Sequence, residues 1–309
     1  MRHWVAASVV GVRVMAEESW LRAAAEHRAR VRRLTGPYRQ RAARGEIHPV
    51  LDFLFVYYSY RPARLERWHP GPGVVLAGAA AREYLGRPGY RPHGGDVVLD
   101  PELLGERAAG TARFVRDLLH ATGQRQPQLG CFGLHEWAMV YRQPAALVRH
   151  RAVPLRLGGG GTDAVVESLP IRCSHHDAFR FFTTEARPRN ALQPTRADQI
   201  RLEQPGCLHA TMDLYKWAYK LAPATPSELV ADCLELAAET RELDMRASPY
   251  DLADLGYPPV PIEAPAGRAE YARLQAALTG RAAPLRDRII QLCDALLGAP
   301  QRPLGEHGA

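Results

Sequence analysis

The sequence predicts an α+β protein that is predominantly α-helical, with a small β element in the middle of the chain. Apolar residues recur at helical spacing in both halves, and a glycine-flanked segment near the centre is rich in Val, Ile and Phe. The 309 residues are 46% hydrophobic and 24% charged, which is typical of a globular protein with a sizeable core. We expect a disordered extension over 1–16, one mainly helical domain with an N-terminal helical arm over 17–298, and a disordered tail over 299–309.

The first half of the chain is expected to alternate helices with loops rich in glycine and proline. Apolar periodicity predicts the helices, and clusters of Pro and Gly predict the loops. In chain order we expect a basic helix over 17–44 interrupted at Gly36-Pro37, a buried helix over 48–60, loop around short elements over 69–96, and helices over 101–122 and much of 129–142.

The second half is expected to begin with the β element, over 153–182, and then to return to helix. Thr225 can cap a helix, Pro226 suits its first turn, and Glu228 completes a capping box. That helix should run to about Arg246 and stop before Pro249. Further helices are expected over 207–221 and about 268–297, the latter with Gly280 and Pro284 as candidate breaks.

The charge balance favours a polyanionic partner such as nucleic acid, since the formal net charge is +7 and the isoelectric point is near 9.3. Many of the cations lie in the basic arm, where they could equally form a solvated helix face. The five cysteines are scattered without a CxxC pair, so the sequence supports neither a disulfide framework nor a zinc knuckle. We expect a cytoplasmic protein that does not associate with membranes.

Lys216 and Lys220 are the only lysines among 40 basic residues. If residues 207–221 are helical, His209, Asp213, Lys216 and Lys220 share one polar stripe on an otherwise apolar helix. The stripe could line a buried cleft, with Asp213, His209 and Lys216 as catalytic groups, or form a narrow solvent face with an Asp213–Lys216 pair. Only a titrating or nucleophilic role would require lysine rather than arginine.

A second candidate is the segment CSHHDAFRFFT, over 173–183. If it is extended, His175, Asp177 and Phe179 share one face and Arg180 lies on the other. Such a face could stack a planar base and deliver a proton, or it could be a core strand whose polar end reaches water. We take Asp177 as a catalytic candidate and His175, Phe179 and Arg180 as candidates for substrate binding.

A third segment, GLHEWAMVYR, supplies His135 and Glu136 as candidates for substrate binding, without the second histidine of an HExxH motif. His135, His175 and His209 could form a metal site only if folding brings them together, and the expectation is a site without metal or cofactor.

Aromatic residues lie beside arginines in YYSYRPARLERWHPGPG, which begins at Tyr57. Tyr57, Tyr58 and Trp68 could therefore stack bases while the arginines hold phosphates. The same aromatic residues could simply belong to the core.

Five long blocks carry a family resemblance: HPVLDFLFVYYSYRPARLERWHPGPG, GCFGLHEWAMVYRQP, CSHHDAFRFFTTEARPRN, LEQPGCLHATMDLYKWAYKL and ELDMRASPYDL. Together they resemble a family of bacterial proteins catalogued as 3-methyladenine DNA glycosylase. The resemblance implies repair of damaged DNA by cleavage of the N-glycosidic bond of an alkylated purine, without a cofactor. It carries over no catalytic residue. The sequence Pro70-Gly71-Pro72-Gly73, followed by Asp96, partly resembles the hairpin and catalytic aspartate of the helix-hairpin-helix glycosylases.

Two alternatives stay open beside this function. One is a metal-dependent hydrolase or oxygenase that acts on a small molecule through His135, His175 and His209. The other is a nucleic-acid-binding protein without enzymatic activity, for which the basic charge is the evidence.

Overall fold

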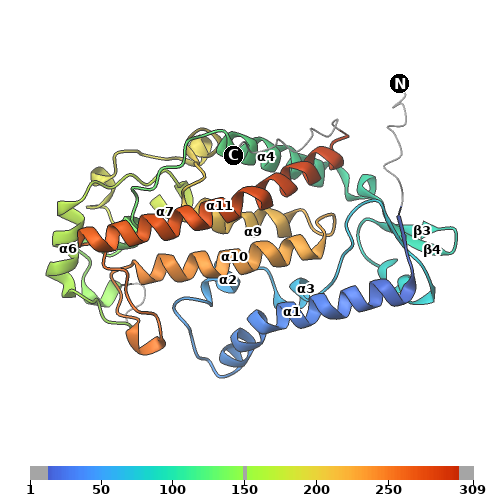
Figure 1. Ribbon diagram of the computed structural model, residues 1–309, viewed down its shortest axis with the longest axis horizontal. Helices are drawn as coiled ribbons and strands as arrows, with labels where there is room; N and C mark the ends of the chain where they lie inside the picture. The colour runs from blue at the N-terminus through green and yellow to red at the C-terminus, as the bar shows by residue number, and fades with distance from the viewer. Residues whose placement is uncertain (1–12, 149–151, 299–309) are drawn as a thin grey trace.

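Long helices form most of the protein. The structure is a computed structural model, and it describes residues 13–148 and 152–298. The helix α9 (Leu208–Lys220) packs against α10 (Ser227–Arg246) and α11 (Pro265–Leu296), as Figure 1 shows. The helix α4 (Gly105–Gly123) packs on α11, and α1 (Glu17–Ala43) runs beside α10. The largest hydrophobic core lies among these helices, so the predominantly helical α+β class is confirmed.

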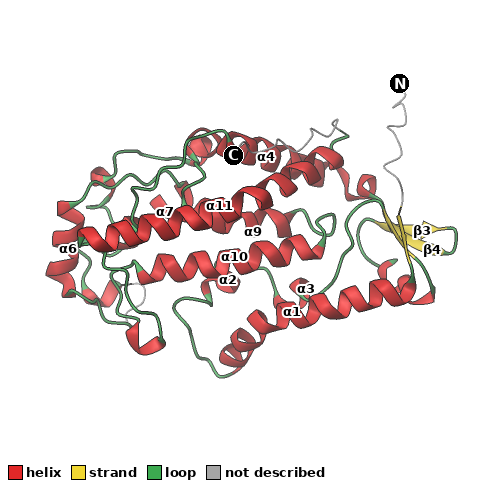
Figure 2. Ribbon diagram, in the orientation of Figure 1, coloured by secondary structure: helices red, strands yellow, loops and turns green. Residues whose placement is uncertain are grey.

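The strands gather at one end of the molecule, beside the start of α1 (Figure 2). They are β1 (Arg13–Met15), β2 (Val74–Leu76), β3 (Tyr90–His93) and β4 (Asp96–Leu99), in the sheet order β1-β2-β4-β3. The β1–β2 pair is parallel, and β4 is antiparallel to both β2 and β3. The partial similarity of this segment to the helix-hairpin-helix glycosylases does not extend to the fold, because the segment builds the sheet and Asp96 accepts a hydrogen bond from the backbone N–H of Gly78.

The segment 153–182, expected to be the β element, is instead mostly helix and loop. Its only pairings among the described residues are isolated bridges, Leu155 with Tyr250 and Ile171 with Asn190. A short run of buried Val and Ile suits a buried helix as well as a strand, and this ambiguity explains the wrong placement. The short helices of the fold are α2 (Phe53–Val56), α3 (Pro62–Leu65), α5 (Leu134–Ala138), α6 (Gly158–Ser168), α7 (His176–Phe179) and α8 (Gln199–Leu202).

The predicted bounds of α10 are correct, but the predicted cap is not. Thr225 donates its hydroxyl to the carbonyl of Ala218, 2.7 Å away, instead of capping the helix. Glu228 accepts a hydrogen bond of 2.6 Å from the Trp68 indole. The start of α10 is therefore held by contacts with other elements rather than by a capping box.

The expected breaks at proline are also wrong, since α1 continues through Pro37 and α11 continues through Pro284. A proline inside a helix costs about 3 kcal/mol, and burial of neighbouring residues offsets that cost. In α11, Ala282 and Ile289 are fully buried on either side of the proline. The helix expected over 48–60 is shorter in the structure, where only α2 (Phe53–Val56) is helical.

The expected disordered extension is wrong for residues 13–15, which form β1. The rest of that extension, 1–12, and the expected tail over 299–309 lie outside the described residues. Within the described part of the chain, no helix combines the length and the apolar character needed to cross a membrane.

His69 joins the small sheet to α10, and we expect it to make the stability depend on pH. Its Nδ1 lies 2.8 Å from the Tyr90 hydroxyl, and its backbone N–H donates to Ser227. Burial, reinforced by Arg87 and Arg67, lowers the pKa of His69 from 6.5 to about 3. The unfolded chain therefore binds one proton more than the folded protein between these values, so folding stability falls as the pH drops below 6.5.

The expected slope from this histidine is at most about 1.4 kcal/mol per pH unit. Urea unfolding of the wild type and of His69→Gln at pH 7, 6 and 5 should show a stability difference that narrows with acid, because only the wild type carries the titrating ring. Parallel pH profiles would contradict this assignment.

Candidate active site

A small cavity lies where α2, α5, α7, α9 and α10 meet, with a volume of about 20 Å³. This is room for about one water molecule. Aromatic side chains form one wall, where the Phe53 and Tyr57 rings stack with centroids 4.7 Å apart. Four titratable side chains and Met139 form the rest. The lining residues are Phe53, Tyr57, Glu136, Met139, Asp177, Phe181, His209 and Arg241.

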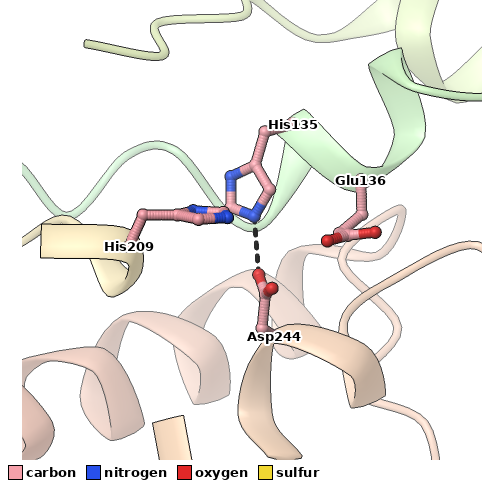
Figure 3. A group of neighbouring side chains, drawn as sticks. All are labelled: His135, Glu136, His209 and Asp244. Atoms are coloured by element: carbon pink, nitrogen blue, oxygen red, sulfur yellow. Dashed lines mark hydrogen bonds and ion pairs between the residues drawn. The ribbon is translucent and has the colours of Figure 1, made fainter. Parts of the chain in front are cut away.

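The first set of buried polar residues lies beside this cavity and consists of His135, Glu136, His209 and Asp244, shown in Figure 3. His135 and Glu136 come from α5, His209 from the first turn of α9, and Asp244 from the last turns of α10. The Nε2 atom of His135 lies 2.6 Å from Oδ1 of Asp244. The guanidinium of Arg241 donates to Oε1 of Glu136 at 2.8 Å and to Oδ2 of Asp244 at 2.7 Å.

The two histidines of this set have opposite pKa shifts. Burial lowers the pKa of His135, but Asp244 outweighs it and raises the pKa well above its ordinary value. Burial and the neighbouring His135 lower the pKa of His209 well below its ordinary value. At neutral pH the set therefore holds an ion pair between His135 and Asp244 beside a neutral His209, which could accept a proton or a metal ion.

The second set is His175, Glu203 and Asp213. In its neutral form His175 caps α7 by accepting the N–H of Ala178 at Nδ1, so the proton of that form is on Nε2. That Nε2 lies 3.2 Å from Oε1 of Glu203 and 3.4 Å from Oδ2 of Asp213. Burial lowers the pKa of His175, but Asp213 and Glu203 outweigh it and raise the pKa to about 9.

Lys216 and Tyr58 complete the surroundings of Asp213. The ammonium of Lys216 forms a short hydrogen bond with Asp213 and lies 3.4 Å from Oδ2 of Asp177. The Tyr58 hydroxyl donates to Asp213 at 3.1 Å, and burial together with Asp213 raises the pKa of Tyr58. Burial lowers the pKa of Lys216, but Asp213 and Asp177 more than reverse this. Lys216 therefore stays protonated and acts through its charge, not as a base or nucleophile.

The polar stripe of α9 and the SHHD segment converge, because the His175 and His209 rings stack with centroids 5.2 Å apart. The helix predicted over 207–221 is confirmed. The sequence left open whether this stripe lines a buried cleft or faces solvent, and the structure shows one part of it in each environment. His209, Asp213 and Lys216 are buried, and Lys220 is exposed with its ammonium 5.4 Å from the Trp217 ring centroid.

Of the residues proposed from sequence, four line the cavity: Tyr57, Glu136, Asp177 and His209. Five are buried among or beside the two sets: Tyr58, His135, His175, Asp213 and Lys216. Arg180 lies at the edge, 3.5 Å from Asp177, while Phe179 is buried against Phe182 and faces the core. Trp68 is not part of the site: it packs in the separate core beside the sheet.

Sequence reasoning missed several groups of the site. Phe53, Met139, Phe181 and Arg241 line the cavity, while Glu203 and Asp244 belong to the two buried polar sets. The signal for Arg241 and Asp244 was available, because a charged pair at i, i+3 stands on an otherwise apolar face of α10. Glu203 lies in a loop and carries no such local signal.

No family model matches the sequence, and neither the curated proteins nor the solved structures contain a significant match.

Proposed function

We propose that this protein hydrolyses the N-glycosidic bond of an alkylated purine in DNA, as its sequence resemblance implies. The observation that supports this function best is the cavity in which aromatic rings face carboxylates. A purine alkylated on a ring nitrogen carries positive charge, which aromatic faces and carboxylates both attract. The same cavity has room for a water molecule, the second reactant.

Asp177 is the carboxylate best placed to act on that water. It lines the cavity, and its side chain is 25% exposed, whereas Asp213 is buried behind Tyr58. In the proposed reaction the water oxygen bonds to the sugar C1′, the C1′–N bond breaks, and its electron pair leaves with the base. Asp177 takes the proton of the water and stabilises the oxocarbenium-like transition state. Lys216, held by Asp213, positions the Asp177 carboxylate.

A purine enters this cavity only if the aromatic wall opens, and Phe181 is the side chain proposed to move. It is 36% exposed, and the Arg180 guanidinium lies 4.4 Å from its ring centroid. Arg187 donates to the carbonyl of Arg180, so two cations stand at this edge of the cavity for the flanking phosphates. Extrusion of the base from the duplex would supply the substrate to the opening.

Damaged DNA as the partner and a cytoplasmic location are parts of the same proposal. A groove beside α1 adds basic surface, with Arg28, Arg32, Arg39, Arg67 and Arg87 among its lining residues. Two of these arginines, Arg32 and Arg39, pair with Glu66, so the groove's charge is partly balanced.

The test is release of free 3-methyladenine from methylated duplex DNA. We expect release by the wild type and a rate at least ~100-fold lower for Asp177→Asn, the scale for loss of a general base. Asp198→Asn is a matched control, because Asp198 is 24% exposed and, like Asp177, pairs with an arginine three residues later. The control should keep the wild-type rate.

Two outcomes would contradict the proposal. One is no free base above the buffer level with the wild type, and the other is equal rates for Asp177→Asn and Asp198→Asn. DNA binding with a steep salt dependence but no base release would favour the binding protein without enzymatic activity.

A further inference from the structure

Four buried side chains beside the cavity, of which Glu136 and His209 line it, have the geometry of a metal site. One ligand atom each from His135, Glu136, His209 and Asp244 lies within 4.8 Å of the others. The side chains come from α5, α9 and α10 and point toward a common centre (Figure 3). All four are buried, so this is not an exposed patch of acidic groups.

We propose that these four residues bind one divalent transition-metal ion. Two imidazole nitrogens with two carboxylate oxygens suit zinc, manganese, iron or cobalt, whereas calcium and magnesium prefer ligand sets made of oxygen alone. When an ion replaces the proton of His135, the two carboxylates and Arg241 together carry one net negative charge, which favours a cation.

His209 is the ligand whose ring contacts two other imidazoles, those of His135 and His175, and for which no hydrogen bond is found among the described residues. Its side chain is only 7% exposed, and its Nδ1 has no hydrogen-bond partner among the described residues. Figure 3 shows the ring directed at His135 and Asp244. An ion bound at the nitrogen that faces His135 and Asp244 would give this buried ring a strong polar interaction, while Nδ1 is not a ligand.

The residues around the four ligands resemble the outer shell of metal sites. Arg241 holds Oε1 of Glu136 and Oδ2 of Asp244, which leaves one oxygen of each carboxylate for an ion. The Cys131 sulfur lies 3.5 Å from Nδ1 of His135 and could accept its N–H. Such contacts orient metal ligands and fix the tautomer of a ligating histidine. Metal binding would displace the proton that His135 shares with Asp244.

The second set does not fit a metal ion equally well. His175 accepts a backbone N–H at Nδ1, so in the neutral ring Nε2 carries the proton. This Nε2 lies 3.2 Å from Glu203 and 3.4 Å from Asp213 but forms no hydrogen bond with a described residue. To bind a metal ion through Nε2, the ring would have to lose this proton. Because Nδ1 carries no proton either, the ring would then be an imidazolate anion. Lys216 already pairs with Asp213, one of the two carboxylates of this set. We therefore infer one ion for each chain, at the first set.

The experiment measures metal binding without any DNA. Protein without a histidine tag is purified without chelator, its metal content is determined by mass spectrometry, and the metal-free protein is titrated with Co²⁺. We expect one ion per chain, visible ligand-field absorption on Co²⁺ binding, and a higher melting temperature. His209→Asn should lose the ion and both signals.

His175→Asn is the matched control, since His175 is a buried histidine whose ring stacks on that of His209. This variant should keep the ion. If His209→Asn fails to fold, as judged by circular dichroism, Glu136→Gln replaces it and should lose the ion. The proposal is overturned if the wild type binds no Co²⁺, if it binds two ions, or if His175→Asn loses the ion while His209→Asn keeps it.

Metal binding is independent of the proposed glycosylase activity, and the same samples separate the two. A bound ion with no base release would refute the glycosylase and leave the metal-dependent alternative. Base release by protein that binds no metal would refute the metal site alone.

Discussion

Lys216→Met is expected to destabilise the protein by about 3–5 kcal/mol, because it leaves the Asp213 carboxylate buried without its cation. The same change at Lys220 is expected to alter the free energy of unfolding by less than about 0.5 kcal/mol. The two lysines form a matched pair. They lie one turn apart on α9, with their ammonium groups 4.4 and 5.4 Å from the Trp217 ring centroid. They differ in two respects: Lys216 is buried whereas Lys220 is exposed, and Lys216 contacts the carboxylates of Asp213 and Asp177.

Urea unfolding at neutral pH checks this prediction, and equal losses in the two variants would contradict it. The activity of the arginine variants adds a second measurement. Lys216→Arg keeps the charge but places a larger group between Asp213 and Asp177, so we expect base release at least ~100-fold slower. Lys220→Arg should keep the wild-type rate, and full activity in both variants would show that the small ammonium of Lys216 does not position Asp177.

Arg241→Met is expected to cost about 3–5 kcal/mol of stability, because Glu136 and Asp244 would both lose the cation that they share. Methionine keeps much of the packing against Phe53, over which the guanidinium lies at 4.3 Å. The loss should therefore reflect the carboxylate of Glu136, which is left without a cation, and the weaker pairing of Asp244, which keeps His135.

Arg286→Met is the control for this prediction, since Arg286 is also buried, 4% exposed against 2% for Arg241. Two of its guanidinium nitrogens have no hydrogen-bond partner within the described residues. Replacing such a group by an apolar one should leave the free energy of unfolding unchanged or raise it. A larger loss for Arg286→Met than for Arg241→Met, by urea unfolding, would contradict the role given to Arg241.

The helices that carry the site could be predicted from sequence because their signals are local. Periodicity placed His209, Asp213 and Lys216 on one face of α9, and the residues around Pro226 and Pro249 marked both ends of α10. The meeting of these faces could not be predicted. The contact between His135 and Asp244 joins residues 109 positions apart, and no local pattern encodes it.

The sheet was misplaced for a related reason. Its strands are three or four residues long, and β1 pairs with β2 although α1 lies between them in the sequence. Strands this short carry too few residues to show alternation. The position of Trp68 could not be predicted from local sequence either. An aromatic residue beside arginines suits a binding surface and a core equally, and only the fold places Trp68 in the core.

The central claim is that the cavity beside Asp177 binds an alkylated purine, and a crystal soaked with 3-methyladenine tests it most directly. The predicted result is electron density for the base against Tyr57, with Phe181 displaced and an N–H of the base donating to the Asp177 carboxylate. Density only in the arginine groove beside α1, or none at a concentration that saturates binding in solution, would contradict the claim.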